Sequence, residues 1–210
     1  MLSVHLPVMP LCVETLTGEA IRPLVPALAR LRTIVFRDFP YCYDGADVSE
    51  REHLAEFAAS PRAGIVVAWD GEEPVGASTC MPLVDEHEWI TDPFRERGLD
   101  PARFFYFGES VLLPAYRGQG VGVVFFERRE AHARAVSDCD YSCFCAVIRD
   151  PNDPRRPRDF VPLNAFWTRR GYTPYPDLCA TLRWREVGHS EETTNRLSFW
   201  IKSLQGAPLP

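Results

Sequence analysis

The fold of this chain is decided by the stretch Val111-Leu112-Leu113-Pro114-Ala115-Tyr116-Arg117-Gly118-Gln119-Gly120-Val121-Gly122. It joins a run typical of a strand, Phe104 to Leu113, to a run typical of a helix that begins near Gly120. Glycine at every second position lets backbone N–H groups face one point, because no Cβ blocks a closely approaching ligand. The first N–H groups of a helix have no partner within it, and the positive end of the helix dipole lies there. The stretch therefore predicts a cradle for an anion such as phosphate, with Arg117 at its edge.

Two other glycine motifs are excluded by the residues themselves. A dinucleotide-binding G-x-G-x-x-G would place its third glycine at position 123, which is Val123. A P-loop would end in Gly-Lys-Ser or Gly-Lys-Thr, and neither occurs here. A glycine-rich turn without a ligand stays open as the alternative for this motif taken alone.

The composition is that of a soluble globular protein. The chain has 210 residues, 46% of them apolar and 25% charged, which suits one domain over residues 1–210 with a sizeable core. Its net charge is −6 without a run of lysines or arginines, so we expect no nucleic-acid surface. No apolar run approaches the roughly 20 residues of a membrane span, and the start lacks the pattern of a signal peptide. We therefore expect a cytoplasmic protein with no membrane partner.

The cysteines and histidines predict neither disulfides nor a metal site. Seven cysteines is an odd number, and Cys143-Phe144-Cys145 lies on a strand-like run instead of forming a C-x-x-C pair. His87 stands among carboxylates without a second histidine or cysteine nearby, which is typical of a solvated loop. We expect reduced cysteines and no metal.

The periodicity of the chain predicts strands and helices in a mixed α+β order. Two helices are expected before position 60, the first over Ile21–Val35 and the second begun by the capping pair Ser49 and Glu52. An Asp-Gly turn joins two antiparallel strands, and residues 82–100 are expected to be irregular. Strands are expected at Leu11–Leu16, Ile65–Trp69, Val75–Met81, Phe104–Leu113, Tyr141–Ile148, Leu178–Trp184 and Leu197–Ile201, and further helices at Gly120–Val136 and Leu163–Arg170.

Two segments resemble the GNAT N-acetyltransferase superfamily. The family's acyl-coenzyme A signature, Arg/Gln-x-x-Gly-x-Gly/Ala, is matched by Arg117, Gly120 and Gly122. Phe166 to Tyr172 is similar to the family's Phe-Tyr-x-x-x-Gly-Phe/Tyr helix end. The resemblance covers roughly Gly64 to Trp184. It implies a single GNAT-like α+β domain whose central mixed sheet has about seven strands, is flanked by helices and is splayed at strands 4 and 5.

The resemblance also implies acetyl-CoA as cosubstrate and assigns residues to it. The diphosphate is assigned to the cradle, which consists of Arg117, Gly118, Gln119, Gly120, Val121 and Gly122. The pantetheine and thioester are assigned to the strand backbone of Ser110, Val111 and Leu112, because in this fold pantetheine lies between the splayed strands like an added strand. A fully paired strand is the alternative. Asn164 is assigned to the pantetheine arm, with capping or solvent exposure as its alternative role.

Glu109 is the candidate general base for the amine proton. Alternation along the strand places its side chain on the same face as Phe107 and Val111. A carboxylate in so aromatic a strand is expected to be partly desolvated, as a general base at neutral pH requires. A structural acid bonded to a helix end or a loop is the alternative, and both readings stay open.

The general acid departs from the family pattern. Where many relatives have a tyrosine after the phenylalanine of the last helix, this chain has Trp167, whose indole N–H does not release a proton at neutral pH. Trp167 is therefore expected along the pantetheine or adenine, or in the core, and the proton donor stays unassigned. Cys145 suggests an acyl-cysteine, but no histidine motif accompanies it, so direct transfer is expected.

The acceptor is expected at the loop that carries Tyr41, Tyr43 and Asp44. An aromatic and acidic cluster suits a cationic or amphipathic amine, and a packed loop with a solvent-facing Asp44 is the alternative. Four arginines would favour instead an acidic acceptor or the 3′-phosphate of the coenzyme: Arg149, Arg155, Arg156 and Arg158.

The sequence thus predicts an N-acetyltransferase that moves an acetyl group from acetyl-CoA to a primary amine of a small molecule or peptide by direct attack. A homodimer is compatible with this prediction. The alternative is a non-catalytic acyl-CoA-binding sensor or interaction module with the same fold. A nucleotide-binding oxidoreductase is disfavoured by Val123 and by the antiparallel hairpin before the cradle.

Overall fold

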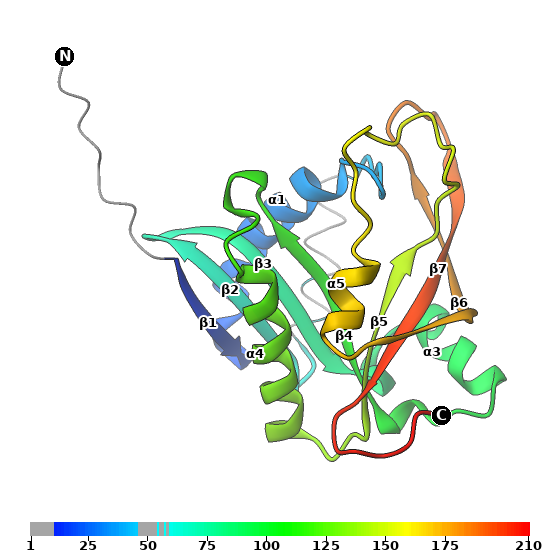
Figure 1. The fold of residues 1–210 in the computed structure, drawn as a ribbon. Coiled ribbons are helices and arrows are strands. Elements are labelled where there is room, and N and C mark those ends of the chain that lie inside the picture. Colours follow the sequence, from blue (N-terminus) through cyan, green and yellow to red (C-terminus); the bar gives the residue numbers. More distant parts are fainter. Residues whose placement is uncertain (1–10, 46–53, 55–56, 58) are drawn as a thin grey trace.

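The computed structural model describes residues 11–45, 54, 57 and 59–210. Its centre is a seven-stranded sheet in the order β1-β2-β3-β4-β5-β7-β6, in which all neighbours are antiparallel except β4 and β5 (Figure 1). The strands are β1 (Cys12–Thr17), β2 (Gly64–Asp70), β3 (Glu73–Pro82), β4 (Phe104–Leu112), β5 (Tyr141–Val147), β6 (Thr173–Arg185) and β7 (Glu192–Ser203).

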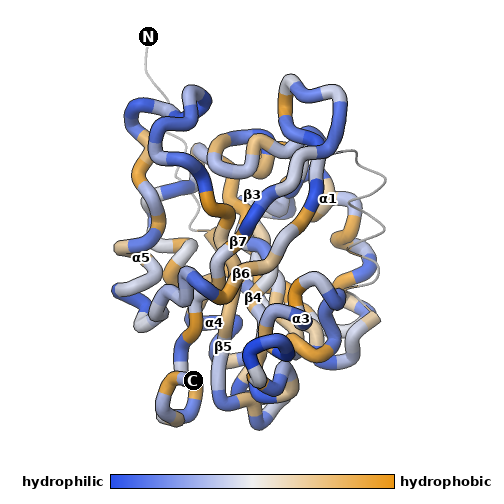
Figure 2. Tube along the Cα trace, turned by 90° about the vertical axis from the view of Figure 1, so that its right-hand side faces the viewer, coloured by the Kyte–Doolittle hydropathy of each residue, from blue (hydrophilic) through white to orange (hydrophobic). Residues whose placement is uncertain are grey.

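Helices cover both faces of this sheet (Figure 1). On one face, α1 (Val25–Phe36) packs on β2 and β3, and α3 (Glu88–Glu96) packs on β4 and β6. On the other face lie α4 (Val121–Val136) and α5 (Asn164–Arg169). Figure 2 shows hydrophobic residues along the central strands and hydrophilic residues in the surrounding loops. The predicted α+β domain, with its mixed sheet flanked by helices, is confirmed.

Short 3-10 turns connect these elements. They lie at Gly18–Ala20 (η1), Arg22–Leu24 (η2), Leu83–Asp85 (η3), Pro101–Arg103 (η4) and Pro114–Tyr116 (η5). The expected capping pair of the second helix, Ser49 and Glu52, lies outside the described residues. Leu54 and Phe57 from that segment are helical and buried against the α1 side of the sheet.

The expectation that residues 82–100 are irregular is wrong, because they contain η3 and α3. Pro93 stands inside α3 and removes one helix hydrogen bond, which is why the segment reads as broken. Ile90 and Phe94 lie one turn apart and are buried against β4 and β6. Burial of this apolar pair offsets the missing hydrogen bond and keeps the helix.

The parallel strands β4 and β5 pair over three residues only: Phe104 with Tyr141, Phe105 with Ser142 and Tyr106 with Cys143. Beyond these pairs β4 continues to Leu112 and β5 to Val147, so the two strands diverge into a V. The predicted splay between strands 4 and 5 is therefore confirmed.

A β-bulge lies in β4 just beyond the apex of this V. Between the pairs Ser78–Ser110 and Cys80–Phe107, the two residues Gly108 and Glu109 face the single residue Thr79. The extra residue reverses the alternation of the strand. Phe107 consequently packs in the cluster under α4, whereas Val111 packs on the α1 side. The expectation that Glu109 shares a face with both is correct for Val111 and wrong for Phe107.

Gly108 gives a test of this bulge. A Cβ at Gly108 would lie 2.5 Å from the Oγ1 of Thr79, so Gly108→Ala is expected to lower the free energy of unfolding by about 1–3 kcal/mol. Urea denaturation measures the change. The same substitution in a Thr79→Ala background should cost less, because the clashing oxygen is gone. An equal cost in both backgrounds would show that the close approach to Thr79 is not what excludes a side chain.

Candidate active site

The glycine stretch forms an open cradle at the start of α4. Gly118 and Gly120 have φ values of 78° and 83°, a region that other residues avoid. Within the described residues, the five consecutive backbone N–H groups of residues 118–122 have no hydrogen-bond partner, whereas those of Val123 and Val124 donate to the Gly120 carbonyl. Such a row of free donors at a helix N-terminus is suited to an anion.

Arg117 and Gly122 complete the cradle. The Nε–H of the exposed Arg117 donates to the carbonyl of Leu112 at 3.1 Å, which keeps the guanidinium at the end of β4. A Cβ on Gly122 would come within 3.4 Å of the ring of Phe166, so this glycine allows α5 to approach α4 closely. The structure thus brings Arg117 to the edge where the diphosphate is predicted.

Of the three β4 residues predicted to bind pantetheine through their backbone, two have backbone polar groups that face the V. The N–H of Leu113 donates to Val75 on β3, and alternate residues of an antiparallel strand share the same partner. The polar backbone groups of Val111 therefore face β3, and those of Ser110 and Leu112 face the V. The expectation that Val111 offers its amide to the coenzyme is wrong for this geometric reason, and its side chain is buried on α1 instead.

Glu109 lies on the α1 side of the V and is tied to its surroundings. Its carboxylate forms an ion pair with Arg32 of α1 at 2.6 Å, and the two side chains are 12% and 14% exposed. Its backbone N–H donates to the Oγ1 of Thr79, and its carbonyl accepts from the Oγ of Ser78. The bulge therefore aims a half-buried carboxylate into the face opposite the cradle.

Glu86 is a second carboxyl group on this face, and the sequence analysis missed it. Burial raises its pKa to about 7, and the negative charge of Glu109 adds to the shift. Glu86 lies between η3 and α3, in the segment read as a solvated loop. Only the apolar spacing of Ile90 and Phe94 signalled that this segment folds back onto the sheet.

Cys145 also lies on this side of β5. Its Sγ is 3.2 Å from the hydroxyl of Tyr106, and burial raises its pKa to about 12. A thiol with so high a pKa is a poor nucleophile at neutral pH, because the thiolate is the reactive form. This argues against an acyl-cysteine.

The residues of α5 lie on the α4 side of the sheet. Trp167 is half-buried, with its ring centroid 5.1 Å from those of Phe144 and Trp200. It therefore packs against the aromatic core cluster on this face, in agreement with the expectation of a place in the core, and its contact with the coenzyme stays a prediction. Asn164 is the first residue of α5 and is exposed.

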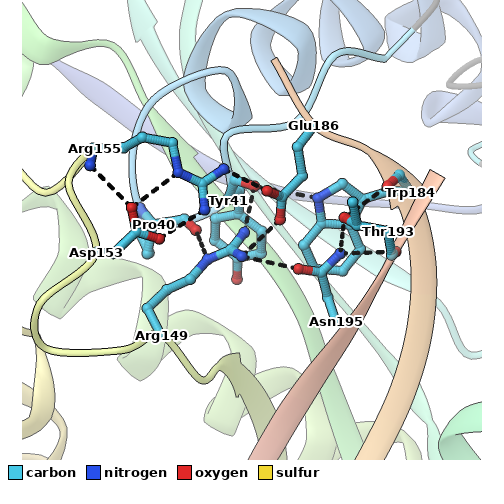
Figure 3. A network of polar contacts seen from close by, with 9 residues as sticks. All are labelled: Pro40, Tyr41, Arg149, Asp153, Arg155, Trp184, Glu186, Thr193 and Asn195. Atoms are coloured by element: carbon cyan, nitrogen blue, oxygen red, sulfur yellow. Dashed lines mark hydrogen bonds and ion pairs between the residues drawn. The ribbon is translucent and has the colours of Figure 1, made fainter. Parts of the chain in front are cut away.

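The loop predicted to hold the acceptor is anchored by Arg149, which follows β5 (Figure 3). Its guanidinium donates to the carbonyls of Pro40 and Tyr41 and to the carboxylate of Glu186. Burial alone would raise the pKa of Glu186, but hydrogen bonds from Arg155 and Arg149 outweigh it and lower the pKa. Arg149 and Arg155 are thus engaged in holding the loop, which removes support for their role in binding an acidic acceptor.

The three predicted acceptor residues do not share one environment. The carbonyl of Tyr41 also accepts from the indole N–H of Trp184, and its phenol is close enough to Glu109 and Cys145 to sense their charges. Asp44 forms ion pairs with Arg37 at 2.8 Å and Arg185 at 3.2 Å, so its charge is already compensated.

A polar pocket of about 650 Å³ lies beside this loop. Its lining includes Tyr43, Asp44, Arg183, Arg185 and Glu192. No residue of β4 or β5 is among the described residues that line this pocket, so Tyr43 and Asp44 border a pocket other than the V.

The described residues lack the marks of two other classes of protein, metalloproteins and membrane-spanning proteins. No group of three or more histidine, cysteine, aspartate or glutamate residues among them is placed to hold a metal ion. No helix among them has the length and apolar character needed to span a membrane.

Comparison with known proteins agrees with this geometry. The profile of the Acetyltransferase (GNAT) family matches residues 28–158. No curated protein matches the chain. Among solved structures, yncA of Salmonella typhimurium, determined with its cofactor acetyl-CoA, is 14% identical with a TM-score of 0.58, over 96% of this chain and 98% of that one.

Two further solved structures have the same fold. The ribosomal-protein-alanine N-acetyltransferase of Brucella melitensis is 14% identical with a TM-score of 0.57, over 91% of this chain and 99% of that one. The loading GNATL domain of CurA from Lyngbya majuscula is 12% identical with a TM-score of 0.60, over 95% of this chain and 100% of that one. Since the family profile matches more than half of the sequence, the chain belongs to the GNAT acetyltransferase family.

Proposed function

We propose that this protein is an N-acetyltransferase that moves the acetyl group of acetyl-CoA to a primary amine of a small molecule or peptide by direct attack. Membership of the family implies acyltransferase activity. The observation that carries the proposal is the V between β4 and β5, which opens beside a cradle of five unpaired N–H groups.

The residues of the V and the cradle fit the coenzyme. The cradle supplies donors and a positive helix end for the diphosphate, with Arg117 beside it. The backbone of Ser110 and the N–H of Leu112 face the V and would bind the pantetheine, whereas the Leu112 carbonyl already accepts from Arg117. The donor that faces the thioester oxygen would stabilise negative charge developing there. Trp167 and Asn164 would lie along the arm. The structure of yncA with acetyl-CoA supports this assignment by similarity of fold.

The amine would enter from the α1 and α3 side, where two carboxyl groups lie. Glu109 is our candidate base, and Glu86 is an alternative that the structure adds. A general base works best when its pKa is near the working pH, which describes Glu86 with its pKa of about 7. Glu109 carries a charge that Arg32 already balances.

A peptide acceptor has support from one relative by fold, since the Brucella melitensis structure is of a ribosomal-protein-alanine N-acetyltransferase. A non-catalytic acyl-CoA-binding module is the second candidate. It has the support of Trp167, which stands where many relatives have a tyrosine acid.

Binding of acetyl-CoA is the first test. At a concentration 100-fold above Kd the coenzyme stabilises the native state by about 2.7 kcal/mol, which raises Tm by about 5–10 °C for a chain of this size. Gly120→Asp is expected to abolish this rise, because its carboxylate would lie among the cradle donors.

Gly188→Asp is the matched control, since Gly188 has a φ of 84° and no neighbour within 4 Å, like Gly120. It should lower Tm by a similar amount and keep the response to coenzyme. No rise in Tm for the wild-type protein would overturn the proposal. A rise without release of coenzyme A from any amine tested would favour the non-catalytic module.

Glu86 predicts a dependence of stability on pH. Its pKa is about 7 in the folded protein and near 4.5 in the unfolded chain, so the folded state binds the proton more tightly. This stabilising contribution is complete below pH 4.5 and is lost as the pH rises through 7. The free energy of unfolding of Glu86→Gln, measured by urea denaturation, should therefore exceed that of wild type by about 1–3 kcal/mol at pH 8. The two proteins should differ little at pH 4.5. Equal differences at both pH values would contradict a raised pKa.

The dependence of kcat/KM on pH separates the two candidate bases. If Glu109 is the base, Glu109→Gln should lose at least about 100-fold in rate together with the acid limb of the profile, and Glu86→Gln should keep that limb. The reverse result would assign the base to Glu86. An unchanged acid limb in both variants would exclude both residues.

A further inference from the structure

Arg129 lies on the third turn of α4, at the apex of the V. Its guanidinium carbon is 4.5 Å from the centre of the Phe107 ring and 4.7 Å from that of Phe126. Phe107 directly follows Tyr106, the last residue of β4 that pairs with β5. The guanidinium therefore lies on the α4 side of the sheet at the point where the two strands separate.

The charge of Arg129 is buried without a carboxylate partner. The residue is 1% exposed, and its one hydrogen bond within the described residues runs from Nε–H to the Phe125 carbonyl at 3.3 Å. The neighbouring Glu130 is bound to Lys202 at 2.7 Å and to Arg134. Both terminal nitrogens of Arg129, with four N–H donors between them, are left unpaired among the described residues.

If Arg129 served folding alone, this arrangement would lower the stability of the folded protein. Burial of an unpaired charge costs more free energy than a desolvated cation–π contact returns. Burial also lowers the pKa of Arg129, although an arginine stays protonated at neutral pH. The protein thus keeps a strong donor in an aromatic environment where nothing in the described chain accepts from its terminal N–H groups.

The side chain is directed toward the open end of the V. Its Nε–H reaches the carbonyl of Phe125, one helical turn earlier, so the guanidinium lies back toward the N-terminus of α4. That end carries the cradle, and β4 runs toward it as it diverges from β5. The nine residue steps from Gly120 to Arg129 rise about 13 Å along the helix, and the backward direction of the side chain shortens that separation.

We propose that the terminal N–H groups of Arg129 donate to a carbonyl oxygen of the pantetheine arm or of the acyl thioester when the coenzyme lies in the V. This inference rests on the proposed function. The phosphates are too far along α4 to be its partner if they occupy the cradle, so the uncharged arm is the part of the ligand that reaches the apex. A charge-assisted hydrogen bond in apolar surroundings is strong, and on the thioester it would also polarise the carbonyl.

The experiment compares two ligands in titrations followed by calorimetry. Acetyl-CoA reaches both the cradle and the apex, whereas adenosine 3′-phosphate 5′-diphosphate is the coenzyme without its pantetheine arm and reaches the cradle alone. Arg129→Met should bind acetyl-CoA at least about tenfold more weakly than wild type and bind the truncated ligand equally well. The free variant should be as stable as wild type or more stable, because a buried unpaired charge is removed.

Arg134→Met is the matched control, since Arg134 lies on the same helix with its side chain 44% exposed and away from the V. It should leave both affinities unchanged. If Arg129→Met does not fold, Arg129→Gln replaces it, with the same loss expected because its shorter amide falls short of the apex. Coenzyme A without the acetyl group distinguishes the acceptor: an equal loss indicates an amide carbonyl, and a loss confined to acetyl-CoA indicates the thioester.

Equal affinities of wild type and variant for acetyl-CoA would overturn the inference. A parallel loss for both ligands would also overturn it, because the effect would then not be confined to the arm. If wild type itself fails to bind acetyl-CoA, the proposed function fails instead, so the two failures are distinguishable.

Discussion

The structure depends on an aromatic group packed on the α4 face of the sheet, where β4 and β5 diverge after three residue pairs. The ring of Phe126 on α4 lies 6.3 Å from Phe107 on β4 and 5.7 Å from Phe144 on β5, and Tyr172 lies 5.2 Å from Phe126 and 5.0 Å from Phe144. Protein interiors are close-packed, so these rings support the two strands in their diverged positions. The separation leaves the backbone of Ser110 without a strand partner on the V side, and such groups need water or a ligand.

Two kinds of charge flank this V, on opposite faces of the sheet. On the α4 face, the cradle, Arg117 and Arg129 present donors and positive charge toward the predicted coenzyme. On the α1 and α3 face, Glu86 and Glu109 present carboxyl groups toward the predicted amine. Burial disfavours the charged form of both Arg129 and Glu86, which lowers the pKa of Arg129 and raises the pKa of Glu86. Unfavourable burial of this kind is expected at functional sites, where stability is lost in exchange for preorganised chemistry.

The sequence was sufficient to predict the features that depend on residues close together in the chain. The cradle follows from glycine spacing, and the strand order follows from periodicity and from the family resemblance. The bulge at Gly108 was missed because it depends on Thr79, 29 residues away in the chain, and it reversed the expected face of Phe107. The helix α3 was missed because Pro93 masks its apolar pair. The role of Arg149 was missed because its partners come from three separate segments, which only the folded chain brings together.

The loop at Tyr41 shows how the acceptor side acquires its selectivity under the proposed function. Asp44 was the acidic residue expected to attract a cationic amine, yet Arg37 and Arg185 already balance its charge. A carboxylate that is paired twice attracts a third cation weakly, since the net charge around it is not negative. Under the proposed function, attraction of an amine then comes from the more buried pair of carboxyl groups, Glu86 and Glu109. Because Glu86 gains its negative charge only as the pH rises through about 7, the site attracts a protonated amine most strongly under the conditions in which it can also remove the proton.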